Sequence, residues 1–320
     1  LIGEEMAADL SMLQDRLSPF TGAGAISTIE AEFDGPIGDI FETFNPDPVA
    51  AASIAQVHRA VTADGAEVAV KVLRPGVEDA FQRDLDLMRW LAERVEESQP
   101  ALRRLKPIEV VETLADTVAM ELDLRLEAAA ADELRRNFED DPNFIVPGVD
   151  WIRTARRVLT TDWIDGVQLH DRDALVNQGH DLENVVANLA GAFFLQIFRD
   201  GFFHADLHPG NLFIAEDGAV IAVDFGIMGR IDKKTRQYLA EMLLGFLTGD
   251  YQRVAEVHFR AGYVPAGQSV DAFAQACRSI GEPILGQSSD HISIGRLLGQ
   301  LFETTEAFAM ETQPQLLLLQ

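Results

Sequence analysis

Two acidic residues and an asparagine within residues 202–226 have the types and spacing needed for phosphoryl transfer. The stretch reads FFHADLHPGNLFIAEDGAVIAVDFG and contains Asp206, Asn211 and Asp224. In phosphoryl transfer the protein itself does little covalent chemistry, and catalysis depends on holding metal ions and a nucleophile in line. Asp206 can orient or deprotonate an acceptor hydroxyl. Asn211 and Asp224 offer the hard oxygen ligands that Mg²⁺ binds.

Two short apolar runs predict the element that positions these side chains. Residues 212–214 and 219–223 flank a Glu-Asp-Gly turn, which is typical of a β-hairpin. A hairpin would fix the distance between Asn211 and Asp224. The alternative is a polar loop and a buried aspartate before a Phe-Gly turn. The D-x-x-x-x-N pair followed closely by D-F-G favours the catalytic interpretation.

A lysine in an apolar strand is a further candidate. The Asp-Gly turn at residues 64–65 lies between the runs 56–61 and 67–73, and this pattern predicts a second hairpin. Lys71 is at the centre of the second run, in V-A-V-K-V-L. A buried ammonium needs a phosphate or a carboxylate as partner. The alternative is an ordinary lysine at a strand edge.

The candidate carboxylate partners of Lys71 lie on a segment that is predicted to be one long helix, residues 107–139. They are Glu121, Asp123 and Glu127. At 100° per residue, Asp123 and Glu127 are about 40° apart around the axis, whereas Glu121 is about 120° from Glu127. We therefore expect one acid to pair with Lys71 while the others face something else. A solvated acidic helix face is the alternative.

Composition narrows the class of protein. The chain has 320 residues, is 47% hydrophobic and carries a formal net charge of −26, values that predict a globular protein and argue against a nucleic-acid partner. The single cysteine, Cys277, excludes an internal disulfide and favours a reducing compartment. The longest apolar run, residues 185–198, contains Asn188 and Gln196 and is interpreted as a core helix rather than a membrane span.

The predicted organisation has three parts: a helical extension at residues 1–47, a β-rich lobe with inserted helices at 48–165, and a helical lobe at 166–320. Hydrophobic periodicity predicts helices at residues 3–16, 25–33, 36–44, 76–98, 107–139, 181–199, 233–249, 251–262, 269–280 and 292–309. Strand-like runs also occur at residues 149–152 and 157–164. The chain begins inside a helical pattern and stops within the leucines at 316–319, so we interpret it as a piece of a longer protein.

The order of these features resembles the two-lobed, α+β protein-kinase-like fold. Two departures narrow the resemblance. An alanine-rich segment, residues 50–58, replaces the glycine-rich loop, and residues 204–211 read H-A-D-L-H-P-G-N. Together with V-A-V-K at 68–71 and E-L-D-L-R-L-E-A at 121–128, these motifs resemble the UbiB family, also called ADCK or aarF-domain atypical kinases. The resemblance covers nearly the whole chain.

The UbiB resemblance implies a biological setting. It implies a role in ubiquinone biosynthesis, binding of ATP or ADP with Mg²⁺, and weak ATPase activity. It also implies association with polyprenyl-phenol lipids or quinone-biosynthesis enzymes. The expected location is the cytoplasmic side of the bacterial inner membrane, reached through segments outside this chain. The family's K-x-G-Q element is expected before Leu1, and membrane-spanning helices are expected after the final leucines.

The resemblance also implies a role for individual residues. The phosphates of the nucleotide would be covered by Ala50, Ala51, Ala52 and Ser53. Residues 161–164, including Asp162, Trp163 and Ile164, would form the hinge to the adenine.

The same resemblance implies that Lys71 would hold the α- and β-phosphates and pair with Glu127. Glu121 and Asp123 match the family's E-x-D element, which faces the amino-terminal extension. Catalytic and metal-binding roles fall to Asp206, Asn211 and Asp224, with Asp206 as the catalytic acid and the other two as metal ligands.

Two other functions are open at this point. One is a pseudokinase-like scaffold that binds nucleotide without turnover, although a scaffold need not keep Lys71, Asp206, Asn211 and Asp224. The other is a small-molecule phosphotransferase of the aminoglycoside or choline kinase type, against which the alanine-rich loop and the 121–127 element argue. His204 and His208, beside the catalytic acid, are interpreted as structural rather than as metal ligands.

Overall fold

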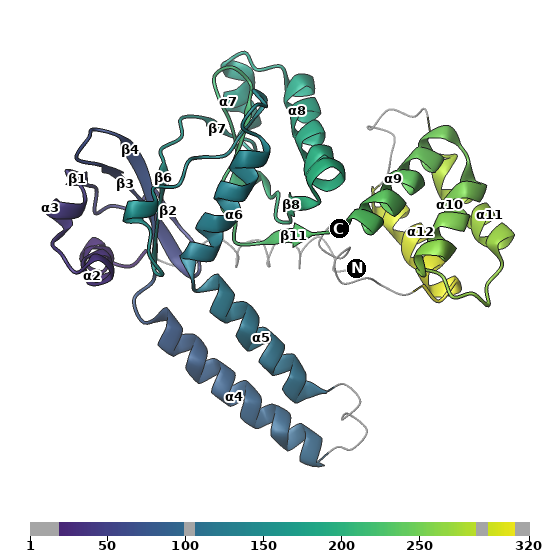
Figure 1. Cartoon of the computed structure of the whole chain (residues 1–320), viewed down its shortest axis with the longest axis horizontal. Coiled ribbons are helices and arrows are strands. Elements are labelled where there is room, and N and C mark those ends of the chain that lie inside the picture. Colours follow the sequence, from purple (N-terminus) through teal and green to yellow (C-terminus); the bar gives the residue numbers. More distant parts are fainter. Residues whose placement is uncertain (1–18, 99–105, 286–293, 311–320) are drawn as a thin grey trace. The chain divides into compact units, whose positions relative to one another are not determined.

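The computed structural model describes residues 19–98, 106–285 and 294–310 (Figure 1). Packing divides the chain into two compact units, one made of residues 1–188 and 207–226 and the other of residues 189–206 and 227–320. The boundaries of these units differ from those of the three predicted parts, residues 1–47, 48–165 and 166–320. The three parts remain predictions. The predicted helix at residues 3–16 lies outside the described residues.

The first unit contains an antiparallel sheet built around the predicted hairpin of residues 56–73. Its strands are β1 (Thr43–Phe44), β2 (Ala50–Ala51), β3 (Ala55–Val61), β4 (Glu67–Leu73) and β6 (Val158–Asp162). They run in the order β1-β3-β4-β6, with β2 pairing β3. Gly65 closes the β3–β4 turn with a φ of 83°, a left-handed conformation that glycine adopts without strain. The predicted hairpin is confirmed.

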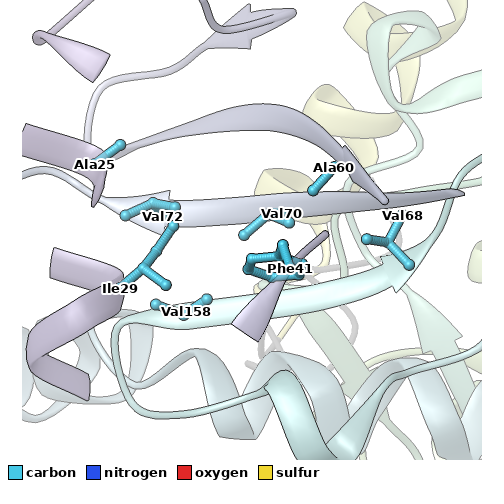
Figure 2. Packing of buried hydrophobic residues seen from close by; sticks show 8 residues of the cluster. All are labelled: Ala25, Ile29, Phe41, Ala60, Val68, Val70, Val72 and Val158. Atoms are coloured by element: carbon cyan, nitrogen blue, oxygen red, sulfur yellow. The ribbon is translucent and has the colours of Figure 1, made fainter. Parts of the chain in front are cut away.

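Alternation along β4 separates two faces of this sheet. Val68, Val70 and Val72 point into a buried cluster with Ile29 and Phe41 (Figure 2). The cluster is covered by α2 (Gly22–Phe33) and by the short α3 (Ile37–Ile40). Because side chains alternate along a strand, the residues between these valines, including Lys71, point to the opposite face.

The predicted helix at residues 36–44 is therefore wrong beyond Ile40. Phe41 leaves the helix with an extended backbone, φ −128° and ψ 140°. Its ring is 2% exposed in the cluster below the sheet, and β1 follows at Thr43. Burial of this aromatic ring against the valines of β4 outweighs the weak helical pattern of the segment.

The opposite face of the sheet is covered mainly by the last of three helices that follow β4. The long helices α4 (Val77–Ser98) and α5 (Pro107–Glu121) pack side by side, and α6 (Leu124–Asn137) packs on the sheet (Figure 1). Leu122, Leu124 and Ala128 are buried against Leu73 and Leu159. Lys71 therefore lies on the face that α6 covers.

The prediction of one continuous helix over residues 107–139 is wrong. The helix breaks at residues 122–123, where Asp123 takes an extended backbone and its side chain accepts the N–H of Arg125 as the N-cap of α6. An aspartate side chain that bonds to the nearby backbone competes with helix continuation, and at the start of a new helix it is favourable. The break changes the direction of every side chain that follows it.

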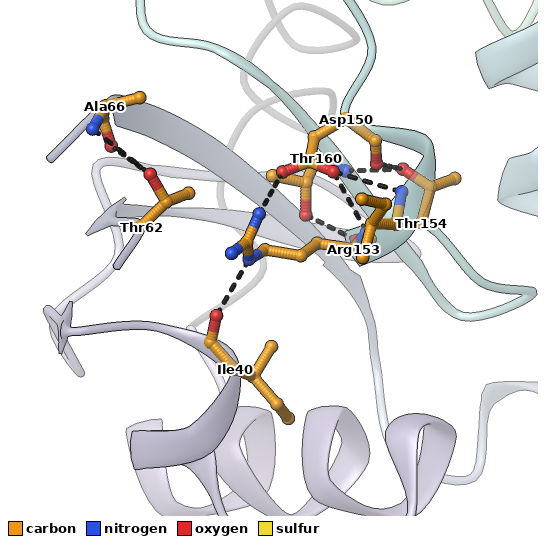
Figure 3. A network of polar contacts seen from close by, with 8 residues as sticks. Ile40, Thr62, Ala66, Asp150, Arg153, Thr154 and Thr160 are labelled. Atoms are coloured by element: carbon orange, nitrogen blue, oxygen red, sulfur yellow. Dashed lines mark hydrogen bonds and ion pairs between the residues drawn. The ribbon is translucent and has the colours of Figure 1, made fainter. Parts of the chain in front are cut away.

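The strand predicted at residues 149–152 is wrong beyond Asp150: Val149 forms an isolated antiparallel bridge with Thr161, but residues Trp151–Arg153 form the 3₁₀ turn η2. The Asp150 carboxylate accepts the N–H groups of Ile152 and Arg153 and forms an ion pair with the Arg153 guanidinium. Arg153 Nε also donates to the Ile40 carbonyl at 2.8 Å (Figure 3). Strand pairing therefore stops after Asp150, whose N–H donates to the Thr160 carbonyl at 2.9 Å, while β6 at Val158–Asp162 lies within the predicted run 157–164.

A second sheet in the first unit holds the 212–223 hairpin. Its strands are β5 (Phe144–Ile145), β7 (Val167–Gln168), β9 (Leu212–Ile214) and β10 (Val220–Ala222), in the order β5-β10-β9-β7. β9 and β10 are antiparallel neighbours, so the predicted hairpin is confirmed. The short α7 (Arg172–Asn177) and α8 (Leu182–Phe194) precede it. The boundary between the two units falls within α8.

The second unit is mainly helical. A π-helical turn, η3 (Leu195–Asp200), continues α8 and leads into β8 (Phe202–His204), which pairs with β11 (Met228–Arg230). The helices α9 (Lys233–Thr248), α10 (Tyr251–Ala261), α11 (Val270–Gly281) and α12 (Ile294–Ala307) follow and confirm the predicted helical tail. In the part of the chain that the structure describes, no helix has both the length and the apolar character required to cross a membrane.

Candidate functional site

Lys71 forms the centre of the candidate site. Its Nζ donates to Glu127 Oε1 at 2.7 Å, to Glu127 Oε2 at 2.9 Å and to Asp224 Oδ1 at 3.0 Å. The Lys71 side chain is only 17% exposed. The strand lysine predicted to need a carboxylate therefore has two, one from α6 and one from the end of the 212–223 hairpin.

Glu127 reaches Lys71 because α6 begins at Leu124. This start places Glu127 in the first turn of the helix, with Leu124 and Ala128 packed on the sheet. Burial raises the pKa of Glu127, and the Lys71 ammonium acts in the opposite direction. Burial disfavours the charge on Lys71, but the carboxylates of Glu127 and Asp224 outweigh it and raise the pKa of Lys71. Lys71 is therefore charged at physiological pH.

Asp224 follows the hairpin with an unusual backbone. Its φ is 62°, in the left-handed region that few residues other than glycine adopt. Aspartate tolerates this region better than most residues, and such conformations are often found at functional sites. The next residue, Phe225, is buried, whereas the Asp224 side chain is 46% exposed. The arrangement presents a carboxylate at the surface beside the buried lysine.

Asn211 lies next to Asp224 at the open end of the hairpin. It ends the 3₁₀ turn η4 (Pro209–Asn211), and its backbone carbonyl accepts the N–H of Val223 at 2.9 Å. Asn211 therefore lies opposite the residue that precedes Asp224. A carboxylate and an amide oxygen are hard donors, and this donor set fits Mg²⁺.

Asp206 belongs to the second unit and is exposed there. Its backbone N–H donates to His204 Nδ1 at 3.1 Å, and the N–H of His204 donates to Gln196 Oε1 at 2.8 Å. These bonds give His204 a part in the backbone structure of its own loop. The His208 ring nitrogen Nδ1 likewise accepts the N–H of Gly210. The catalytic role of Asp206 stays a prediction.

The alanine-rich loop has an ordinary backbone. Ala50 and Ala51 form β2 and pair with Val57 and Gln56, and the N–H of Ala52 donates to the Ala55 carbonyl at 2.8 Å. None of residues 50–53, all of which the structure describes, has a positive φ. The loop thus adopts conformations that alanine tolerates, and one of its N–H groups is already used within the loop.

The predicted hinge residues are bonded within the first unit. The backbone N–H of Asp162 donates to Gly148, and that of Trp163 donates to Glu67. The Trp163 ring stacks under the Arg59 guanidinium at 4.6 Å and donates to Asp165. Because these two N–H groups are already used, an adenine bound at residues 162–164 would have to form its hydrogen bonds with backbone carbonyls or with Ile164.

Glu121 and Asp123 are separated from Lys71 by the break between α5 and α6. Glu121 is the exposed last residue of α5. Asp123 forms an ion pair with Arg125 at 2.6 Å, and Arg125 lowers the pKa of Asp123. Only Glu127 of the three acids pairs with Lys71, as the sequence predicted, although the single helix used in that argument was wrong.

Gln196 is a residue whose role sequence reasoning missed. It was interpreted only as a polar interruption of the apolar run 185–198. A polar side chain inside a core helix needs a hydrogen-bond partner, and this requirement was the available signal. The partner, the backbone of His204, lies eight residues away and depends on the fold.

Known families match most of this chain. Residues 12–258 match the ABC1 atypical kinase-like domain. This chain belongs to the ABC1 atypical kinase-like family. Residues 277–320 also match the UbiB helical domain, so the resemblance to UbiB proteins is confirmed.

Similar curated proteins carry the description "Probable protein kinase UbiB". The chain is 43% identical over 324 residues to the protein of Marinobacter nauticus, covering all of this chain and 59% of that protein. It is 42% identical over 324 residues to the protein of Azotobacter vinelandii, covering all of this chain and 60% of that protein. The chain therefore spans about 60% of the length of these relatives.

The match to the ABC1 atypical kinase-like domain and the observed mixture of helices and sheets confirm the α+β, kinase-like fold class, and one solved structure is similar. The Rv3197–erythromycin complex from Mycobacterium tuberculosis is similar with a TM-score of 0.69 and 29% sequence identity. The match covers 88% of this chain and 70% of that one.

Proposed function

We propose that this chain is the catalytic core of an ATP-binding atypical kinase that hydrolyses ATP or transfers its γ-phosphoryl group with Mg²⁺. The observation that carries the proposal is the contact of Lys71 with both Glu127 and Asp224. In kinase-like folds, a strand lysine paired with a helix glutamate binds nucleotide phosphates beside the aspartate of the D-F-G motif.

The residues divide the work of phosphoryl transfer. Glu127 keeps the Lys71 ammonium oriented, and Lys71 provides positive charge for the α- and β-phosphates. Asn211 and Asp224 would hold Mg²⁺, which would neutralise the charge on the phosphates. Asp206 would orient the acceptor hydroxyl or a water molecule.

The biological role that we propose is support of ubiquinone biosynthesis. The UbiB descriptions of the relatives and the UbiB helical domain at residues 277–320 support it. Polyprenyl-phenol lipids or quinone-biosynthesis enzymes are the proposed partners. The proposed location is the cytoplasmic side of the bacterial inner membrane, through parts of the longer protein.

The decisive experiment measures Mg²⁺-dependent ATP hydrolysis by the full-length protein, with and without a phenolic quinone precursor and anionic lipid. We expect Asp224→Asn and Lys71→Met to abolish turnover. Lys106→Met is the matched control, because the Lys106 side chain is 64% exposed and forms a local ion pair with Glu109. Equal rates in wild type and Asp224→Asn would overturn the enzymatic proposal. Nucleotide binding without turnover in the wild type would instead support the scaffold alternative.

A further inference from the structure

Gln196 is placed to act on the loop that carries Asp206. It lies in η3, the π-helical turn between α8 and β8, and its side chain is fully buried. Its neighbours Phe193, Ile197 and Phe198 belong to an apolar cluster with Phe203 and Ile231. A π-turn inserts an extra residue into a helix, and such turns are frequent at functional sites.

The chain reverses sharply between Gln196 and its partner. Gly201 ends the π-turn with a φ of 67°, and a Cβ at this position would lie 2.6 Å from the Ile231 carbonyl oxygen. The reversal brings His204 back to η3, where its N–H donates to Gln196 Oε1 at 2.8 Å. Only the oxygen end of the amide can accept this proton, so the orientation of the Gln196 side chain is fixed.

His204 is in turn hydrogen-bonded to the backbone of Asp206. The ring nitrogen Nδ1 of His204 accepts the backbone N–H of Asp206 at 3.1 Å. His204 is itself 1% exposed and pairs through β8 with Met228 of β11. Two consecutive hydrogen bonds therefore connect a buried amide in η3 to the backbone of the loop acid.

The other end of the Gln196 amide shows that the residue is not optimised for stability. Its Nε2 is buried and has no hydrogen-bond partner among the described residues. An unpaired buried donor is unfavourable, and an apolar side chain of similar length would avoid it. The glutamine is nevertheless present, and its Oε1 accepts the backbone N–H of His204, a bond that an apolar side chain could not form.

From these contacts we infer that Gln196 is a positioning residue, which holds the backbone of His204 and, through the His204 ring, that of Asp206. The inference rests on the proposed function, because it concerns the loop that would orient the phosphoryl acceptor. It predicts that loss of the Gln196 carbonyl impairs turnover without impairing nucleotide binding, which would depend on Lys71 and Asp224 of the other unit.

The test uses the full-length protein with Gln196→Met, which keeps side-chain length and removes the acceptor. Gln196→Glu serves as the conservative rescue, because full burial favours the neutral carboxylic acid, which keeps an acceptor oxygen for the His204 N–H. Ile197→Leu is the matched control, because Ile197 is buried in the same π-turn and its side chain makes no hydrogen bond. Hydrogen exchange of the peptide covering residues 202–206 is measured together with kcat and KM for ATP.

We expect exchange at residues 204–206 to rise about tenfold in Gln196→Met and to stay near the wild-type value in the control. We expect kcat to fall about tenfold to a hundredfold with little change in KM, since a small displacement of a reacting group has effects of this size. Gln196→Glu should recover most of both quantities. Unchanged exchange in Gln196→Met, or an equal loss of kcat in Ile197→Leu, would overturn the inference.

A second measurement protects the test against misfolding. If Gln196→Met does not fold, His204→Phe removes the Nδ1 acceptor and keeps a ring of similar size. Raised exchange at Asp206 alone then supports the relay, and unchanged exchange overturns it. If the wild-type protein does not hydrolyse ATP, the proposed function fails, and the exchange measurements still decide whether Gln196 positions the loop.

Discussion

The Lys71 ammonium lies 3.0 Å from Asp224 Oδ1 while it is also bonded to both carboxylate oxygens of Glu127. Lysine and aspartate are 153 residues apart in sequence, and each comes from a different sheet of the first unit. One contact is buried and the other is half exposed. The two carboxylates therefore have different effects on stability and function.

The buried partner should matter for stability. Removing the ammonium with Lys71→Met leaves Glu127 as an uncompensated buried acid, which typically costs about 3–5 kcal/mol. We expect the free energy of unfolding, measured with urea, to fall by this amount. Lys71→Met combined with Glu127→Leu should be less destabilised than the single variant. A single variant as stable as wild type would contradict this prediction.

The exposed partner should matter for the ligand instead. Asp224→Asn removes an ion pair whose acid is 46% exposed, so the free energy of unfolding should change by less than about 1 kcal/mol. The affinity for Mg²⁺ with ATP should fall about tenfold or more, because a carboxylate ligand is lost. Calorimetric titration of nucleotide with and without Mg²⁺ measures this. Equal affinities in the presence of Mg²⁺ would exclude Asp224 as a metal ligand.

The alanine-rich loop should control the nucleotide pose. Ala51→Gly frees the backbone at a strand residue paired with Gln56, at a stability cost of about 0.5–1 kcal/mol. Greater freedom should let the loop N–H groups approach the phosphates, and both nucleotide affinity and autophosphorylation should change. Ala66→Gly, in the distant β3–β4 turn, is the control. Affinity and autophosphorylation equal to wild type in Ala51→Gly would count against the hypothesis.

His58 should make the stability of the first unit pH-dependent. Burial lowers the pKa of His58, although its bond to the Asn45 carbonyl and the charge of Asp47 act in the opposite direction. Because a depressed histidine pKa disfavours protonation of the folded state, stability should be lost as pH falls below the unfolded value of about 6.5. The slope contributed by His58 should be at most about 1.4 kcal/mol per pH unit.

The measurement is urea unfolding between pH 7.5 and about 5, the range around the unfolded histidine pKa. His58→Gln should reduce the pH dependence. His258, whose pKa is also lowered by burial, should keep a residual dependence in His58→Gln. Identical pH profiles for wild type and His58→Gln would show that His58 does not titrate differently on folding.

The cluster below the first sheet should be sensitive to truncation. Phe41→Ala removes a ring that is 2% exposed and packs against the β4 valines, and it should lower the free energy of unfolding by about 3–5 kcal/mol (Figure 2). Ile152→Ala is the control, since its side chain is 83% exposed and a change within about 0.5 kcal/mol is expected. Similar losses in the two variants would contradict the assignment of this core.

The predictions that failed share a physical cause. Periodicity reports which face of an element is apolar, but it does not show where a side chain ends that element. Asp123 and Asp150 both accept nearby backbone N–H groups, and these local bonds divide the helix predicted at 107–139 and end the strand predicted at 149–152 after its first residues. Phe41 ends its helix for a different reason, because its ring is needed in the core.

The sequence alone determined the elements whose signals are local. The hairpins around Gly65 and Gly218 follow from turn residues between apolar runs, and the helices from Lys233 onward follow from periodicity and caps. The sequence also predicted an anionic partner for Lys71, because this lysine lies in an apolar strand. Only the tertiary structure decided that this partner is both Glu127 and Asp224, and that Gln196 holds His204. These pairings depend on where α6 begins and on how the chain reverses at Gly201, and packing of distant segments sets both.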